Sequence, residues 1–292
     1  MKRLPSLAVL LLAPGLALAQ APDPAATSPG PAPAQLAPAQ PRQAAVTLRA
    51  SFAGNQQPIR AGMIWRVYED RGEGIVPNLV VKSDLPNPTL PLPPGNYIVH
   101  AAYGFASAST RLAVQWTNLD ERVTISAGAL RLKGAVGESP IAPGSLSFSI
   151  YVPIGNDAEG RLVVGGVRGD EVVRLPEGTY HVVSNYGDTN AIMRSDLRVE
   201  AGRVTEATLN HRAATVTLKL VASEGGEAFA GTAFSVLTPG GDVIREAIGA
   251  FPSLTLAEGE YVLIARHEGQ VHTREFKVES GLNRDIEVLA KK

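Results

Sequence analysis

A short segment occurs three times in the chain and sets the period of everything around it. It reads LPPGNY at residues 92–97, LPEGTY at 175–180 and LAEGEY at 256–261. The first and second tyrosines lie 83 residues apart, and the second and third lie 81 apart. A constant period of this length is typical of tandem structural units. The sequence therefore predicts repeated copies of one small fold.

Each copy is rich in short β-strand signals. The first contains VTLRASF, MIWRVY, NLVVK, NYIVHAAY, STRLAVQ and RVTIS, separated by Gly, Pro, Asn and Asp. Six or seven such strands within one period is the spacing of a β-sandwich. We therefore predict an all-β chain with three tandem Greek-key β-sandwich domains. Their predicted boundaries are 45–127, 128–211 and 212–292.

The repeated segment itself predicts a structural corner. In NYIVHAAY, alternation places Tyr97, Val99 and Ala101 on the less polar face, which we expect to point inward. We expect the leucine to fill the core, the glycine to permit a tight turn, and the tyrosine hydroxyl to bond to upstream backbone, as in the tyrosine corner of Greek-key sandwiches. The predicted corner residues are Leu92, Gly95, Tyr97, Leu175, Gly178, Tyr180, Leu256, Gly259 and Tyr261.

The first 44 residues carry export signals and a linker composition. Lys2 and Arg3 precede an apolar run, and Ala17 and Ala19 form an A-x-A cleavage signature. We predict a signal peptide at 1–19 and a periplasmic or secreted protein, with no membrane insertion after cleavage. Residues 20–44 contain 7 Pro and 8 Ala, a composition that cannot bury a core, which predicts a disordered linker.

Composition excludes several classes of site. The chain has no cysteine, so it forms no disulfide, zinc–thiolate site or thiol nucleophile. Its formal net charge of −1 would become −3 on loss of Lys2 and Arg3 with a cleaved leader. No basic cluster is longer than the pair Lys291 and Lys292, so no basic stripe is present and nucleic acid is not an expected partner.

The pattern L-P-P-G-x-Y-x-V-x-A-x-Y-G at 92–104 resembles carboxypeptidase-regulatory-like domains, which have a transthyretin-like sandwich, and more loosely bacterial immunoglobulin-like modules. The resemblance extends over all three copies. It implies a seven-strand sandwich and a non-catalytic role. The chain departs from the family in lacking a D-x-x-G-x-F segment ahead of the corner, and NDAEGRLVV, which starts at Asn156, is the nearest approach.

Catalytic and metal-binding motifs are absent from the sequence. No GxSxG, HExxH, P-loop, Rossmann or EF-hand pattern occurs, so we expect neither an enzyme nor a cofactor. His267 and His272 form the one close histidine pair, with Glu268 beside them. Zinc requires three or four protein ligands, and no further one is evident, so no metal site is predicted.

Two loops and one aromatic residue are the candidate binding positions. Loops carry function more often than strands do, although turn formation explains acidic loop residues equally well. The candidates are Glu69, Asp70 and Glu73 in YEDRGEG, Asp157 and Glu159 in the second copy, and Trp116 in VQWTN.

These observations predict a non-catalytic interaction or structural module of the bacterial cell envelope that binds an envelope protein or glycan through outward loops. An envelope glycan-binding protein is the first alternative, with Trp116 as the exposed aromatic platform. A hydrolase with a site at a domain junction is the second. It would be marked by a cleft that holds two carboxylates or a histidine–acid pair.

Overall fold

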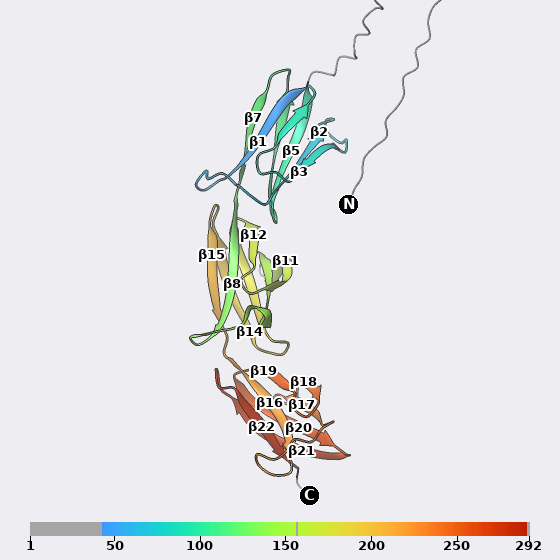
Figure 1. Cartoon of the computed structure of the whole chain (residues 1–292), viewed down its shortest axis with the longest axis vertical. Helices are drawn as coiled ribbons and strands as arrows, with labels where there is room; N and C mark the ends of the chain where they lie inside the picture. Colours follow the sequence, from blue (N-terminus) through green and yellow to red (C-terminus); the bar gives the residue numbers. More distant parts are fainter. Residues whose placement is uncertain (1–42, 156, 291–292) are drawn as a thin grey trace, which may run out of the picture. The chain divides into compact units, whose positions relative to one another are not determined.

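The computed structural model describes residues 43–155 and 157–290, and most of them lie in β-strands (Figure 1). Within these ranges, the single helical element is a 3-10 turn at Pro143–Ser145. The prediction of an all-β chain is therefore confirmed. The predicted signal peptide and the predicted linker up to residue 42 lie outside the described residues.

The strands form six sheets that enclose three separate hydrophobic clusters. We call them the first, second and third sheet pair. Each is built from a contiguous stretch of chain, as the colours in Figure 1 show. The first sheet pair consists of β1 (Ala44–Phe52), β2 (Met63–Glu69), β3 (Asn78–Ser83), β4 (Thr89–Leu92), β5 (Gly95–Tyr103), β6 (Ala106–Val114) and β7 (Leu119–Ile125).

The other two sheet pairs repeat this order. The second consists of β8 (Ala127–Val136), the two-residue β9 (Ser139–Pro140), β10 (Leu146–Ile154), β11 (Asp157–Arg168), β12 (Val172–Pro176), β13 (Gly178–Tyr186), β14 (Ile192–Val199) and β15 (Val204–Asn210). The third consists of β16 (Ala213–Val221), β17 (Ala233–Leu237), β18 (Val243–Ile248), β19 (Ser253–Ala257), β20 (Gly259–His267), β21 (Gln270–Val278) and β22 (Arg284–Leu289).

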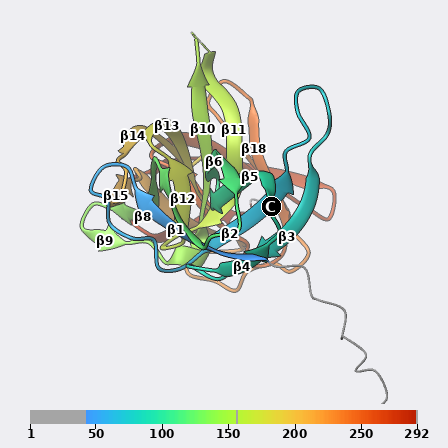
Figure 2. The same cartoon turned by 90° about the horizontal axis from the view of Figure 1, so that it is seen from above.

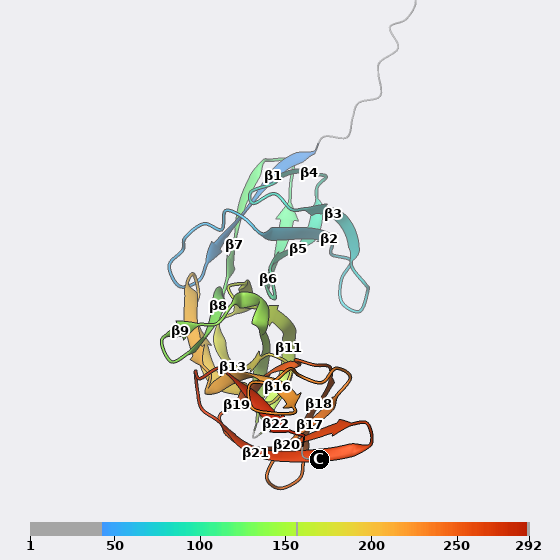
Figure 3. The ribbon, with the colours of Figure 1, turned by 60° about the horizontal axis from the view of Figure 1, so that its bottom comes forward.

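Strand order is the same in all three sheet pairs. The first combines a three-stranded sheet, β4-β1-β7, with a four-stranded sheet, β3-β2-β5-β6. The second has β12-β8-β15 and β11-β10-β13-β14, and the third has β19-β16-β22 and β18-β17-β20-β21. In the third sheet pair, β16 pairs with β19 on one side and with β22 on the other, and Figure 3 labels these strands. The first and last strands of each copy pair in parallel and the other pairings are antiparallel.

Period-2 alternation builds each core. In β2 the side chains of Met63, Trp65 and Val67 are buried, while the residues between them point outward. Phe148 in β10 and Phe234 in β17 are buried at the corresponding places. Each large buried side chain contributes roughly 1.5–3 kcal/mol of apolar transfer free energy. The predicted inward face of the corner strands is confirmed, because the alternate residues that follow each tyrosine are buried.

The connections between sheet pairs are very short. Ser126 alone separates β7 from β8, and two residues separate β15 from β16. Ala127 begins β8 but packs in the first core, and Ala44 belongs to β1 and is buried there too. The linker was predicted to end at residue 44, which is the first residue of β1. Independent folding of the three predicted domains remains a prediction.

Across the part of the chain that the structure describes, no helix is long and apolar enough to cross a bilayer.

Candidate functional site

The corner tyrosines are buried and hydrogen-bonded. Each hydroxyl donates to the backbone carbonyl four residues earlier: Tyr97 to Pro93 at 2.8 Å, Tyr180 to Pro176 at 2.9 Å and Tyr261 to Ala257 at 2.8 Å. Burial raises the pKa of all three hydroxyls, so they stay protonated and act as donors at neutral pH. The leucines that open the corners, Leu92, Leu175 and Leu256, are buried in the three cores. These groups are engaged in packing.

The corner glycines differ from expectation. Neither Gly95 nor Gly259 has a positive φ, so the backbone freedom of glycine is not what these two positions require. A Cβ added at Gly95 would lie 3.5 Å from the ring and hydroxyl of Tyr97. That distance is ordinary van der Waals contact, so the space beside the tyrosine ring does not require glycine either.

Four of the six candidate binding residues lie at one end of the first sheet pair. Glu69 is opposite Tyr97 in the β2–β5 ladder, and Gly95 is opposite Val114 in the β5–β6 ladder. The loop that follows Glu69, the corner, and the loop that follows Val114 therefore share this end. We call residues 69–77, 93–96 and 115–118 the first end surface. It contains Glu69, Asp70, Glu73 and Trp116.

The acidic residues of this surface differ in their bonds to neighbouring groups and in their exposure. The Asp70 carboxylate lies 3.3 Å from the Arg111 guanidinium, accepts a 3.1 Å hydrogen bond from the N–H of Gly72, and its side chain is only 18% exposed. Glu69 contacts Arg71 at 2.9 Å. Glu73 is exposed in the same loop. Asp70 thus shapes the loop, whereas Glu69 and Glu73 remain accessible at its surface.

Asp157 and Glu159 belong to the second sheet pair. They lie at the start of β11, which forms a long hairpin with β10 (Figure 2). Asp157 is opposite Ile154 at the tip of that hairpin. The side chains of both acidic residues lie outside the part of the chain that the structure describes. These two candidates are therefore separate from the four at the first end surface.

In the second sheet pair, the equivalent end contacts the β5–β6 hairpin of the first. The N–H of Phe105 donates to the carbonyl of Arg174 at 3.1 Å, and the Arg174 guanidinium lies 5.0 Å from the centre of the Tyr103 ring. A Cβ added at Gly104 would lie only 2.6 Å from the Arg174 Cβ, so the approach requires glycine.

In the third sheet pair, the equivalent end contacts the β13–β14 connection. The Asn190 amide donates to the Tyr261 hydroxyl at 2.9 Å and accepts from the N–H of Ala257 at 3.1 Å. Asp188 in the same connection forms a 2.6 Å ion pair with Arg245. The corner end of the second sheet pair and the corner end of the third therefore each contact the preceding sheet pair.

Trp116 occupies a special position at this end. It lies two residues after Val114, which is opposite the corner Gly95. Ala201 and Ser280 hold the same position in the second and third copies. Ala201 is buried, and its carbonyl oxygen would lie 2.9 Å from a Cβ added at Gly54 of the first sheet pair. Trp116 is 69% exposed. The first copy thus presents a large aromatic ring where the second packs against its predecessor.

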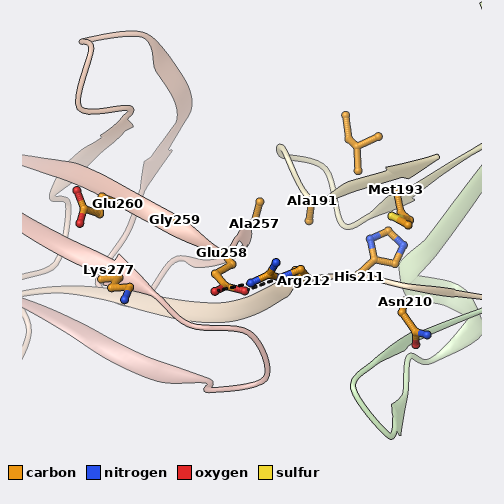
Figure 4. A pocket seen from close by; sticks show the side chains of 11 residues that line it. Ala191, Met193, Asn210, His211, Arg212, Ala257, Glu258, Gly259, Glu260 and Lys277 are labelled. Carbon is orange, nitrogen blue, oxygen red and sulfur yellow. Dashed lines mark hydrogen bonds and ion pairs between the residues drawn. The ribbon is translucent and has the colours of Figure 1, made fainter.

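A hollow of about 540 Å³ lies beside the connection between β15 and β16 (Figure 4). Arg212 and Glu258 face one another there with two hydrogen bonds of 2.9 and 3.0 Å. Figure 4 shows Glu260 apart from this pair, and Glu260 is opposite Lys277 in the β20–β21 ladder. The lining residues are Ala191, Ile192, Met193, Asn210, His211, Arg212, Ala257, Glu258, Gly259, Glu260 and Lys277.

His211 in the wall of this hollow is buried and bonded. Its Nε2 lies 2.8 Å from the Ser184 hydroxyl, and its ring meets Tyr186 edge-on with 5.8 Å between ring centres. Burial lowers the pKa of His211, and a hydrogen bond with the Ala191 backbone acts in the opposite direction. The hollow holds two carboxylates, Glu258 and Glu260, which is the feature expected of the hydrolase alternative. Glu258 is bonded to Arg212 and His211 is bonded to Ser184, so both side chains have structural partners.

The other histidines form no metal centre. His181 Nδ1 lies 2.7 Å from the Asp196 carboxylate on the outer face of the second four-stranded sheet, apart from the hollow. His267 stacks on Phe229 with 5.2 Å between ring centres, and His272 is opposite Ala265. Among the residues that the structure describes, no group of three or more His, Asp or Glu side chains could hold a metal ion.

Sequence reasoning did not find two sets of residues. Asn190 was missed because nothing near it in the chain signals a partner 71 positions later. A row of outward basic groups, Arg66, Lys82 and His100, was missed because alternation shows that Arg66 and His100 point outward but does not show which residues pair across strands.

Comparisons with known proteins find similarity in repeat and fold. The family model of a Rhizobiales growth-associated tandem repeat domain matches residues 215–290, which lie in the third sheet pair. No curated protein matches the chain.

Solved structures also show likeness at low identity. The Bacillus anthracis TIE protein is 16% identical, with a TM-score of 0.26, and the match covers 86% of this chain and 50% of that one. The major pilin subunit of Bacillus cereus is 12% identical, with a TM-score of 0.26, over 85% of this chain and 100% of that one. The minor pilin of Streptococcus agalactiae is 12% identical, with a TM-score of 0.29, over 57% and 95%.

Proposed function

We propose that this chain is an exported, non-catalytic interaction module of the bacterial cell envelope, which binds a protein partner through the first end surface. The observation that carries the proposal is the 69% exposure of Trp116 at a position that is buried as Ala201 in the second copy. In two of three copies the corner end meets another part of the chain, and the first copy has no preceding sheet pair among residues 43–290.

A single exposed tryptophan is well suited to anchor a partner. Tryptophan is enriched among the residues that dominate binding free energy, because its ring buries a large area at low conformational cost. Pro93, Pro94 and Asn96 of the corner share this end with Trp116. These side chains supply an apolar centre with polar groups at its margin, the usual composition of a binding patch.

The rim of the surface carries negative charge. Glu69, Asp70 and Glu73 outnumber the two nearby arginines, Arg71 in the same loop and Arg111, which pairs with Asp70. Charge complementarity favours a partner with a basic patch, and its main effects are on orientation and association rate. The acidic candidates thus act as a rim around the Trp116 anchor.

The similarity of 215–290 to a growth-associated tandem repeat domain supports a growth-associated role for this chain. The resemblance of the corner motif to carboxypeptidase-regulatory-like domains, with seven paired strands in the first and third sheet pairs, supports a module that serves binding. The predicted signal peptide supports a periplasmic or secreted location.

Capture from envelope extract tests the proposal. The mature protein serves as bait beside Trp116→Ala, Glu69→Gln/Glu73→Gln and a matched control, Phe251→Ala, which removes another exposed aromatic ring of the third sheet pair. We expect one protein to be retained by the mature protein and Phe251→Ala, lost at least about tenfold on Trp116→Ala, and weakened more by salt in the wild type than in the glutamate variant.

Two outcomes contradict this function. Retention of a glycan in place of a protein, with the same loss on Trp116→Ala, would favour the glycan-binding alternative. Turnover of generic ester, phosphate or glycoside substrates that disappears in a folded Glu258→Gln or Glu260→Gln variant would favour the hydrolase alternative at the hollow of Figure 4.

A further inference from the structure

Two basic side chains and a histidine form a row across the outer face of the first four-stranded sheet. Arg66 in β2 is directly opposite Lys82 in β3 on one side and His100 in β5 on the other. Trp65 and Val67 point into the core, so Arg66 points away from it. Directly opposed residues in a sheet have Cβ atoms about 4.5–5.5 Å apart, so these three side chains are neighbours.

No ion pair between described residues neutralises the row, although the exposed Asp84 follows Lys82 by two residues. Neither Arg66 nor Lys82 forms an ion pair with any residue in the described ranges. Asp70, the nearest acid in the loop after β2, is committed to Arg111. On the far side of His100, β6 places Ser109 directly opposite, which adds a hydroxyl at the end of the row.

This arrangement is unfavourable without a ligand. Like charges placed directly opposite one another in a sheet destabilise it. Arg66 is only partly exposed, and the Nδ1 atom of His100 is buried without a hydrogen-bond partner. Burial and the charge of Arg66 lower the pKa of His100.

The row is specific to the first copy. In the second sheet pair the place of Arg66 is held by Ser149 and that of His100 by Val183. In the third, Ser235 is opposite Glu246 and Ile264. The fold therefore does not require basic groups at these positions, since two copies form the same sheet without them.

We propose that Arg66, Lys82 and His100 form a binding site for an oxyanion group, a phosphate, sulfate or carboxylate carried by a ligand that lies on the outer face of β3, β2 and β5. Arginine presents a fork of donors that matches two oxygens, lysine adds a point charge, and histidine adds one N–H donor. An anion here removes the repulsion within the row. Tyr68 and Ile98, opposite one another in the adjacent outward row, offer a surface for the body of the ligand.

The test titrates the whole mature protein with inorganic phosphate at low ionic strength and follows the side-chain resonances of the histidines by NMR. We expect saturable shifts at His100, none at His272, and displacement by sulfate but not by an equal concentration of chloride. Arg66→Gln should weaken phosphate at least about tenfold and Lys82→Gln severalfold. Parallel titrations with glucose 6-phosphate and glucuronate distinguish a phosphate-bearing from a carboxylate-bearing ligand.

A matched variant controls for general charge loss. Arg122 is an exposed arginine of β7, in the other sheet of the same pair, and Arg122→Gln should leave phosphate affinity unchanged. Phosphate should raise the melting temperature of the wild type and of Arg122→Gln but not that of Arg66→Gln. Equal phosphate affinity in the wild type and Arg66→Gln, or the absence of saturable binding in the millimolar range, would overturn the proposal.

Discussion

Asn190 donates a 2.9 Å hydrogen bond from its side-chain amide to the hydroxyl of Tyr261, which lies in the next sheet pair. The same Asn190 side chain accepts a 3.1 Å bond from the N–H of Ala257, the residue whose carbonyl receives the Tyr261 hydroxyl. One residue of the β13–β14 connection thus completes the corner that follows it. The third corner therefore packs in its own core and also forms a joint, by which we mean its hydrogen bonds to Asn190 of the second sheet pair.

The first prediction separates this corner from the other two. Tyr97→Phe and Tyr180→Phe each remove one hydroxyl bond to backbone, so we expect each to lower the free energy of unfolding by about 1–2 kcal/mol. Tyr261→Phe should lower it further, because it also leaves the Asn190 amide without its acceptor. Urea denaturation measures the differences. Tyr68→Phe is the control, since the Tyr68 hydroxyl makes no hydrogen bond with a described residue. Equal losses at Tyr97 and Tyr261 would argue against the joint.

The second prediction concerns coupling across the joint. Asn190→Ala and Tyr261→Phe remove the same hydrogen bond, so their combination should destabilise by less than the sum of the single changes. We expect a coupling free energy of about 0.5–1.5 kcal/mol, the usual net contribution of one hydrogen bond. The combination of Asn190→Ala with Tyr97→Phe, in the first sheet pair, should be additive. Additivity in both combinations would show that the Asn190–Tyr261 contact contributes nothing in solution.

The third prediction follows from buried His211. Burial holds its pKa below the ordinary value of 6.5, so the unfolded chain takes up a proton at a higher pH than the folded chain does. The contribution of this residue to stability is therefore full above pH 6.5 and is lost as the pH falls below 6.5 toward the folded pKa. Urea midpoints between pH 8 and pH 5 measure it.

His211→Gln should flatten this pH dependence. His100 also has a lowered pKa, through burial and the neighbouring Arg66, so part of the slope should survive in His211→Gln and fall further when His100 is replaced as well. A wild-type slope that is identical in His211→Gln would contradict the assignment.

The fourth prediction is that the sheet pairs are separable domains. Each has its own hydrophobic cluster and complete strand set. A fragment of residues 128–211 should give a cooperative thermal transition and a β-type circular dichroism spectrum. Its stability should fall below that of the same unit in the whole chain, since Arg174 loses its contacts with Tyr103 and Phe105. A fragment without cooperative unfolding would mean that the units depend on their neighbours to fold.

Much of the fold can be predicted from the sequence because it depends on interactions between residues that are close in the chain. The Leu-x-x-Gly-x-Tyr segment contains both partners of the hydrogen bond that forms the corner, since the tyrosine hydroxyl donates to a carbonyl only four residues earlier. Alternation in MIWRVY and NYIVHAAY is enough to assign Trp65 and Val99 to the core, because successive side chains of a strand point to opposite faces.

Only the tertiary structure decided which surface residues meet. Trp116 and Glu69 are individually visible in the sequence, but strand pairing determines that their loops share one end. The Lys82–Arg66–His100 row depends on the register of two ladders, and a slip of one residue would break it. The Asn190–Tyr261 bond depends on the contact between two sheet pairs. Such contacts join residues that are distant in the chain, so no local pattern of residue types encodes them, whereas the period and alternation of the sequence determine the strands, the cores and the corners.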